Sequence, residues 1–140
     1  MKFLSSLLSL LVLIIVVTAK VPTHRNDLTA SEQVQLDLYP TGSWIDSKYD
    51  NQKFTQYEGV IHNNSPFTLT EVNINILNPN GLHLRDDTIW NMNWRNSYPP
   101  HNQFYLPPGE SIYQNNVYKF TFIVQGNGYP QLELGSVKYS

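Results

Sequence analysis

The sequence predicts an all-β domain, an antiparallel β-sandwich of about seven to eight strands. Short runs in which apolar and polar residues alternate recur along the chain, and they are rich in β-branched and aromatic residues. Clusters of Gly, Pro and Asn separate the runs, as turns with a positive or fixed φ require. No ten-residue segment carries the apolar stripe of an amphipathic helix. No internal repeat is visible, so one domain is expected.

The alternation also places individual strands. Clear runs of period two lie at 33–38, 72–77, 118–124 and 132–139. In the last run Gly135 shifts the parity, which predicts a β-bulge. Turn clusters lie at 62–66, 78–81, 106–111 and 126–130. Because of their aliphatic neighbours or regular alternation, we assign four aromatic residues to the core: Phe67, Tyr118, Phe120 and Phe122.

The N-terminal residues predict a secretory signal peptide. Lys2 supplies a positive start, and the apolar run that follows is shorter than the ~20 residues that a membrane-spanning helix needs. Val17 and Ala19 are small enough for the positions before a signal peptidase site, so cleavage is expected after Ala19. The predicted organisation is a signal peptide at 1–19, a flexible leader at 20–31 and a domain at 32–140. We therefore expect an extracellular protein with no membrane attachment after signal cleavage.

The composition narrows the class of partner. The formal charge is −2 and only 14% of the residues are charged, which argues against nucleic acid or an anionic membrane surface. Asn, Gln, Ser and Thr are abundant, so the surface suits a neutral, hydroxyl-rich partner. The chain has no cysteine, and the core must hold without disulfides. We expect a monomer.

No catalytic constellation is visible in the sequence. The histidines show no pair at ligand spacing, and the chain has neither a G-x-S-x-G elbow nor a phosphate-binding glycine loop. A glycosidase pair stays open at this stage, because its two carboxylates can come from distant positions. We expect a protein that is not an enzyme and that holds no metal or cofactor. The Asn-Asn-Ser sequence at 63–65 is the chain's one acceptor motif and predicts a glycan on Asn63.

The stretch "TIWNMNWRNSY" at 88–98 places aromatic residues in an unusually polar setting. If its backbone is extended, one side of the strand carries Trp90, Met92, Trp94, Asn96 and Tyr98. Trp44 likewise lies in a polar segment. Such rings form either the inner face of a strand or a surface that stacks on the flat apolar face of a sugar ring. The residues alone leave both interpretations open.

The order of the sequence landmarks resembles carbohydrate-binding module family 49, which occurs in plant family-9 endoglucanases and secreted cellulose-binding proteins of slime moulds. The matching segments are "GSW" at 42–44, "KFTQYEGVIHNNS" at 53–65, "LTEVNINI" at 69–76, "TIWNM" at 88–92, "SYPP", "LPPGES" and the strand around Phe120. The resemblance spans 34–139. It implies a β-sandwich that binds cellulose through surface aromatic residues, carried over here as Trp44, Phe54, Tyr57, Trp90 and Tyr98. Phe54 stands where the family usually has Tyr.

Trp94 has no counterpart in the family pattern. We include it among the candidate carbohydrate-binding residues, and it either extends the same surface or packs inward. The resulting hypothesis is a secreted, non-catalytic module that binds cellulose or a related β-glucan. Two alternatives remain at this stage. One is a small secreted glycan-modifying protein, and the other is an Ig-like adhesion or coat protein that binds another protein.

Overall fold

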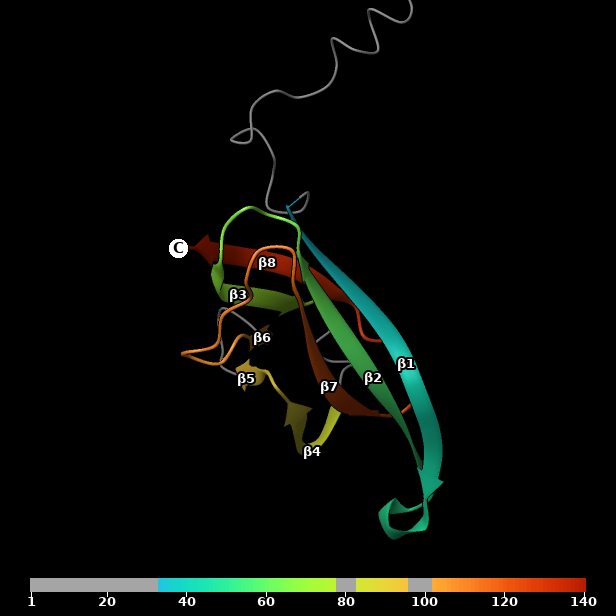
Figure 1. Ribbon diagram of the computed structural model, residues 1–140. Coiled ribbons are helices and arrows are strands. Elements are labelled where there is room, and N and C mark those ends of the chain that lie inside the picture. The colour runs from blue at the N-terminus through green and yellow to red at the C-terminus, as the bar shows by residue number, and fades with distance from the viewer. Residues whose placement is uncertain (1–32, 78–82, 96–101) are drawn as a thin grey trace, which may run out of the picture.

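The structure, a computed structural model, describes residues 33–77, 83–95 and 102–140. The predicted signal peptide at 1–19, the leader at 20–31 and Tyr98 lie outside the described residues. The described residues form two four-stranded antiparallel sheets that pack face to face (Figure 1), which confirms the predicted β-sandwich. No helix in these ranges is long and apolar enough to cross a membrane.

Each sheet combines one pair of consecutive strands with strands that are distant in sequence. Sheet A has the order β1-β2-β7-β4 and consists of β1 (Val34–Asp46), β2 (Gln52–Asn63), β7 (Val117–Gln125) and β4 (His83–Trp90). Sheet B has the order β5-β6-β3-β8 and consists of β5 (Asn93–Arg95), β6 (Gln103–Tyr105), β3 (Leu69–Ile76) and β8 (Leu132–Tyr139). Strands β1 and β2 are joined by a 3-10 turn at Ser47–Tyr49, and their long ribbon curves away from the sandwich in Figure 1.

The core is aromatic where the two sheets meet. Phe104 of sheet B lies 5.1 Å from Phe122 and 6.1 Å from Phe120 of sheet A, measured between ring centroids. All three rings are fully buried. Phe120 and Phe122 are therefore core residues, as predicted. Aromatic contacts at these separations add to the free energy gained by burying the rings.

The structure tests three further predictions: the core positions of Phe67 and Tyr118 and the bulge at Gly135. Phe67 is 49% exposed in the connection between β2 and β3, where its ring meets Tyr139 edge-on, so its assignment to the core was wrong. Phe67 lies in a loop, where the alternation that buries every second side chain of a strand does not apply. The bulge at Gly135 is confirmed, because Gly135 and Ser136 together lie opposite Asn73. Tyr118 is partly buried against the core, and burial raises the pKa of its hydroxyl group.

Gly59→Ala should destabilise the domain, because a Cβ at this position would overlap the ring of Phe120. Overpacking of this kind costs roughly 1–3 kcal/mol of the free energy of unfolding. Gly42→Ala is the matched control on the neighbouring strand, since a Cβ there meets no atom within 4 Å. Urea denaturation of both variants gives the comparison. Equal stabilities of the two variants would contradict the close packing of Phe120 over Gly59.

Candidate functional site

The outward surface of sheet A carries exposed aromatic side chains at both of its edges. One cross-strand row contains Tyr39 of β1, Glu58 of β2, Thr121 of β7 and Trp90 of β4, each paired with the next. Directly paired residues project on the same side of a sheet. Thr121 lies between the inward-facing Phe120 and Phe122, so the row faces outward. Tyr39 is 51% exposed and Trp90 is 48% exposed, and three strand spacings separate them by roughly 14 Å.

Trp44 lies on this same surface. It pairs with Phe54, which pairs in turn with Gln125 of β7. Gln125 and Thr121 are four residues apart on one strand and therefore face the same side, separated by roughly 13 Å. Strand register thus brings the predicted residues Trp44 and Trp90 onto one face, although they are far apart in sequence.

A compact group of side chains fixes the orientation of Trp44. Its ring stacks on Phe54 with 6.0 Å between centroids, and Tyr49 meets Phe54 edge-on at 5.5 Å. The guanidinium carbon of Arg85 lies 4.8 Å from the centroids of both the Tyr49 and Phe54 rings. Asp46 accepts a hydrogen bond of 3.4 Å from Arg85. Cation–π contacts and an ion pair therefore hold the β1–β2 turn against β4.

Phe54 and Tyr57 are not ligand-contacting residues, contrary to the expectation from the family resemblance. Phe54 is 0% exposed beneath the side chains just described, so its ring supports Trp44 and reaches no ligand. Tyr57 is 5% exposed and projects into the core, where it stacks on Phe122 at 5.6 Å. Burial, and after it the neighbouring Tyr129, raise the pKa of the Tyr57 hydroxyl. Neither ring can stack on a sugar without unfolding its surroundings.

The expected single row does not extend from Trp90 to Trp94, and its further members Asn96 and Tyr98 lie outside the described residues. The backbone turns at Asn91, whose φ of 66° lies in the left-handed region, and the chain passes from sheet A into sheet B. Met92 is buried in the core at the crossing. Trp94 then pairs with Phe104 and packs partly buried against the core. Trp90 and Trp94 therefore serve different sheets, and Trp94 does not extend the surface around Trp90.

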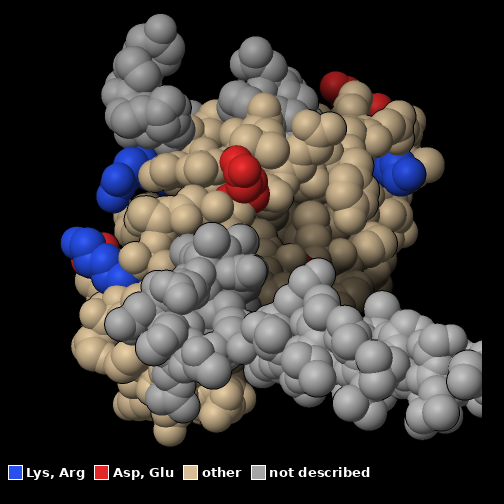
Figure 2. Space-filling view, turned by 90° about the horizontal axis from the view of Figure 1, so that it is seen from above, with Lys and Arg blue, Asp and Glu red and all other residues tan. Residues whose placement is uncertain are grey.

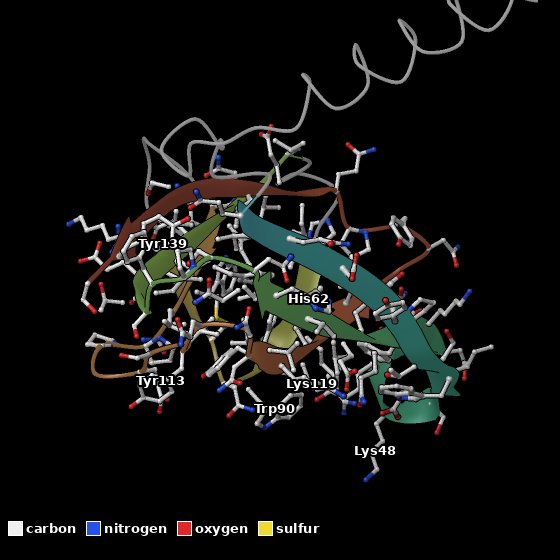
Figure 3. All side chains as sticks on the ribbon, turned by 45° about the horizontal axis from the view of Figure 1, so that its top comes forward. Lys48, His62, Trp90, Tyr113, Lys119 and Tyr139 are labelled. Atoms are coloured by element: carbon white, nitrogen blue, oxygen red, sulfur yellow. The ribbon has the colours of Figure 1, made fainter. Side chains whose placement is uncertain are left out.

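Polar side chains lie between the aromatic residues, and the charged ones are paired. Lys119 lies 3.6 Å from Glu58, and His62 lies 2.9 Å from Asp37. Figure 3 shows Trp90 and Lys119 projecting from the same side of the ribbon. On the side that Figure 2 presents, charged side chains are scattered over a mostly uncharged surface. Among the described residues no group of three His, Asp or Glu could hold a metal ion.

Sequence reasoning missed three residues of this surface. Tyr39 continues the alternation of Gln35 and Asp37, so its outward direction was readable from the strand pattern. Tyr49 and Arg85 carry no such signal, because their contacts join a turn to a strand that follows more than thirty residues later. Together these residues make a rigid, nearly neutral face of rings and hydrogen-bonding groups.

Asn63, the predicted glycosylation site, is fully buried. Its Nδ2 donates hydrogen bonds of 2.8 Å to the carbonyl oxygens of Phe67 and Ile112. Its Oδ1 accepts hydrogen bonds from the backbone and side chain of Ser65, at 3.0 and 2.6 Å. A glycan on Nδ2 would replace one of the two hydrogens that Nδ2 donates and would have to occupy the interior. The structure therefore contradicts the expected glycan, and the motif serves instead as a brace between two loops.

The comparisons with known proteins identify relatives. The chain is 32% identical over 111 residues to "Stalk-specific protein A" of Dictyostelium discoideum, covering 76% of this chain and 67% of that protein. "Stalk-specific protein B" of the same organism is 31% identical over 111 residues, which again cover 76% of this chain and 67% of that protein. The chain belongs to the family of Dictyostelium stalk-specific proteins. No family model matches it, so carbohydrate-binding module family 49 is not confirmed.

The fold of this stalk-specific family member also resembles parts of larger solved proteins. One is a GH20 exo-β-N-acetylglucosaminidase from Vibrio harveyi, with a TM-score of 0.52 and 14% identity over 73% of this chain. Another is a chitinase from Bacillus thuringiensis, with a TM-score of 0.50 and 14% identity over 76% of this chain. The matches cover 17% and 15% of those proteins, and they show a shared fold alone.

Asn63→Ala should destabilise this domain, because the buried backbone N–H of Ser65 loses its acceptor and the carbonyl groups of Phe67 and Ile112 each lose one of their two donors. Each unsatisfied buried group costs about 1–3 kcal/mol of the free energy of unfolding. Asn64→Ala is the matched control, since that side chain is exposed. Thermal unfolding measures the difference, and mass spectrometry of the secreted protein should find Asn63 without a glycan. A stable Asn63→Ala variant or an occupied Asn63 would contradict the brace.

Proposed function

We propose that this protein is a secreted, non-catalytic module that binds cellulose or a related β-glucan through the outer face of sheet A. The observation that carries the proposal is the half-exposed ring of Trp90, in one cross-strand row with the exposed Tyr39. A glucosyl ring presents a flat plane of C–H groups that stacks on indole or phenol rings. Equatorial hydroxyl groups at its rim can bond to the polar residues between them.

The shape of the surface favours a polymer over a small molecule. The aromatic residues lie along an open sheet face, where a long chain can contact several of them at once. Strand pairing fixes the backbone at Tyr39 and Trp90, and the contacts of Arg85 and Phe54 fix the position of Trp44, before any ligand arrives. Binding then costs little ordering of the protein, which raises affinity for a chain of repeated rings. Exposed tryptophan is otherwise costly, because each ring leaves a large apolar area in water.

The absence of catalysis is part of the proposal. Asp37, Asp46 and Glu58 on the outer face of sheet A each lie beside a cationic or basic side chain. These carboxylates therefore serve as ion-pair partners. A glycosidase instead uses two carboxyl groups that flank the scissile bond. The relatives' name refers to a stalk, and we extend this to an extracellular structural role for the present chain.

The secreted protein should co-sediment with microcrystalline cellulose at micromolar concentrations and release no reducing sugar. Stacking on a neutral polymer should persist at 1 M salt, because that ionic strength screens charge pairing and not apolar contact. Chitin and xylan are the comparison polymers. Absence of binding to cellulose would overturn the proposed ligand. Glucan turnover by the pure protein would favour the glycan-modifying alternative, and binding abolished by salt would favour a charged protein partner.

Trp90→Ala should weaken cellulose binding by removing the contact of sheet A, with little loss of stability, whereas Phe120→Ala should lose ~3–5 kcal/mol of the free energy of unfolding. The reason is that Trp90 is half-exposed and Phe120 is fully buried. Tyr113→Ala is the control for removing an exposed aromatic ring, since Tyr113 is 64% exposed on a different loop. Cellulose partitioning and denaturant unfolding measure the two effects. If Trp90→Ala binds as well as Tyr113→Ala, the surface of sheet A is not the contact.

A further inference from the structure

The outward surface of sheet B carries an ordered array of six polar side chains, four of which are amides. The array consists of two cross-strand rows, one formed by Asn93, Tyr105 and Asn73 and the other by Arg95, Gln103 and Asn75. Between these rows, Phe104 and Ile74 are fully buried on the inner side. Alternation along each strand therefore turns all six residues of the array outward. We call these six residues the amide array.

The amide array is rich in asparagine, a residue that is uncommon in β-strands. Asparagine is depleted in β-strands, yet strands β3 and β5 place it at three of the six outward positions. Each amide offers two donor hydrogens and an acceptor oxygen without a net charge. A sugar hydroxyl is also a donor and an acceptor without charge, so the two groups match in number and in kind.

Contacts within the sheet fix the orientations of three of the four amides. Gln103 donates a hydrogen bond of 2.7 Å to Oδ1 of Asn75, and Asn73 donates one of 2.8 Å to the hydroxyl group of Ser136. The Asn75 amide also lies close over Gly135, where an added Cβ would come within 3.1 Å of both of its terminal atoms. The bulge at Gly135 thus leaves the space that the Asn75 amide occupies.

A depression adjoins the array and gives a ligand a place to enter. It has a volume of about 480 Å³, and its lining includes Glu71, Asn73, Arg95 and Tyr105. The Arg95 guanidinium carbon lies 4.8 Å from the centroid of the Tyr105 ring. An arginine stacked in this way keeps the N–H groups at its rim available to an oxygen acceptor.

We propose that the outer face of sheet B is a second binding site, for a neutral glycan chain held by hydrogen bonds instead of ring stacking. A neutral ligand fits this surface best, because its charges offset one another: Glu71 in the depression is paired with Lys138 at 3.1 Å, and Arg95 lies on the same face as Glu133, which pairs with Asn75. The two sheets pack by their inner faces, so the sites on the outer faces of sheets A and B point in opposite directions. One domain can then bridge two glycan chains, and this bridging rests on the proposed function of sheet A.

The first experiment isolates sheet B by using Trp90→Ala as the background. Soluble cellohexaose is titrated into this variant while NMR follows the side-chain amide signals of Asn73, Asn75, Asn93 and Gln103. We expect these signals to shift. Adding Asn75→Ala and Gln103→Ala should weaken binding about three- to tenfold, as the loss of one or two net hydrogen bonds implies. Gln114→Ala, which removes an exposed loop amide, should leave the affinity unchanged.

The outcomes separate the two proposals. If the amide signals stay still while the protein with Trp90 intact binds cellulose, the site on sheet B is overturned and the function of sheet A stands. Shifts of the array signals, with cellulose binding unaffected by Trp90→Ala, would support sheet B and overturn sheet A. If neither protein binds any glucan, both proposals fail.

The second experiment measures bridging directly. Two populations of cellulose particles with different dyes are mixed with the protein, and co-aggregation is counted by microscopy. The unaltered protein should join the two colours, whereas Trp90→Ala and the Asn75→Ala, Gln103→Ala variant should coat particles without joining them. Sedimentation velocity checks the oligomeric state of the protein. Bridging by either variant, or bridging by a dimer in solution, would overturn the assignment of two sites to one domain.

Discussion

The contact of Phe104 with Phe120 and Phe122 holds the two sheets together, and the remaining features of the molecule depend on it. The chain has no cysteine, so apolar packing and strand pairing stabilise the sandwich without a covalent link. Gly59 contributes by leaving room for the Phe120 ring. Once these rings face inward, the pleat determines which side chains of the neighbouring positions face outward. The inward direction of these rings thus determines which residues of both sheets form the outer surfaces.

The two outer surfaces use different chemistry on the same scaffold. Sheet A presents tryptophan and tyrosine at its edges with paired charges between them, whereas sheet B presents amides in two rows. Each surface is stiffened locally, by the stacking of Arg85 on Phe54 and Tyr49 in one case and by hydrogen bonds to Asn75 and Asn73 in the other. A β-sandwich supplies both surfaces because its sheets pack by their inner faces alone.

Asn63 illustrates how one motif can have two physical meanings. The letters Asn-Asn-Ser describe an acceptor for a glycan in an exported protein, and the same letters suit a tight turn. Here the amide of Asn63 satisfies carbonyl groups from two loops, and Ser65 satisfies the amide oxygen. A buried asparagine of this kind links the loops at 64–68 and 106–116 more specifically than apolar contact could, because its donors and acceptor have fixed directions.

The sequence by itself determined the β-sandwich, the main strands, the bulge at Gly135 and the core positions of Phe120 and Phe122. Local patterns carry that information, because alternation with period two reports the pleat directly. Only the tertiary structure decided that Trp44 and Trp90 share a face, that Trp94 lies apart from Trp90, and that Phe54, Tyr57 and Asn63 are buried. These facts depend on which strands pair and in what register, and on a single turn at Asn91 that moves the chain from one sheet to the other. Pairing between strands distant in sequence leaves no local pattern, so it becomes visible only when the sheets have formed.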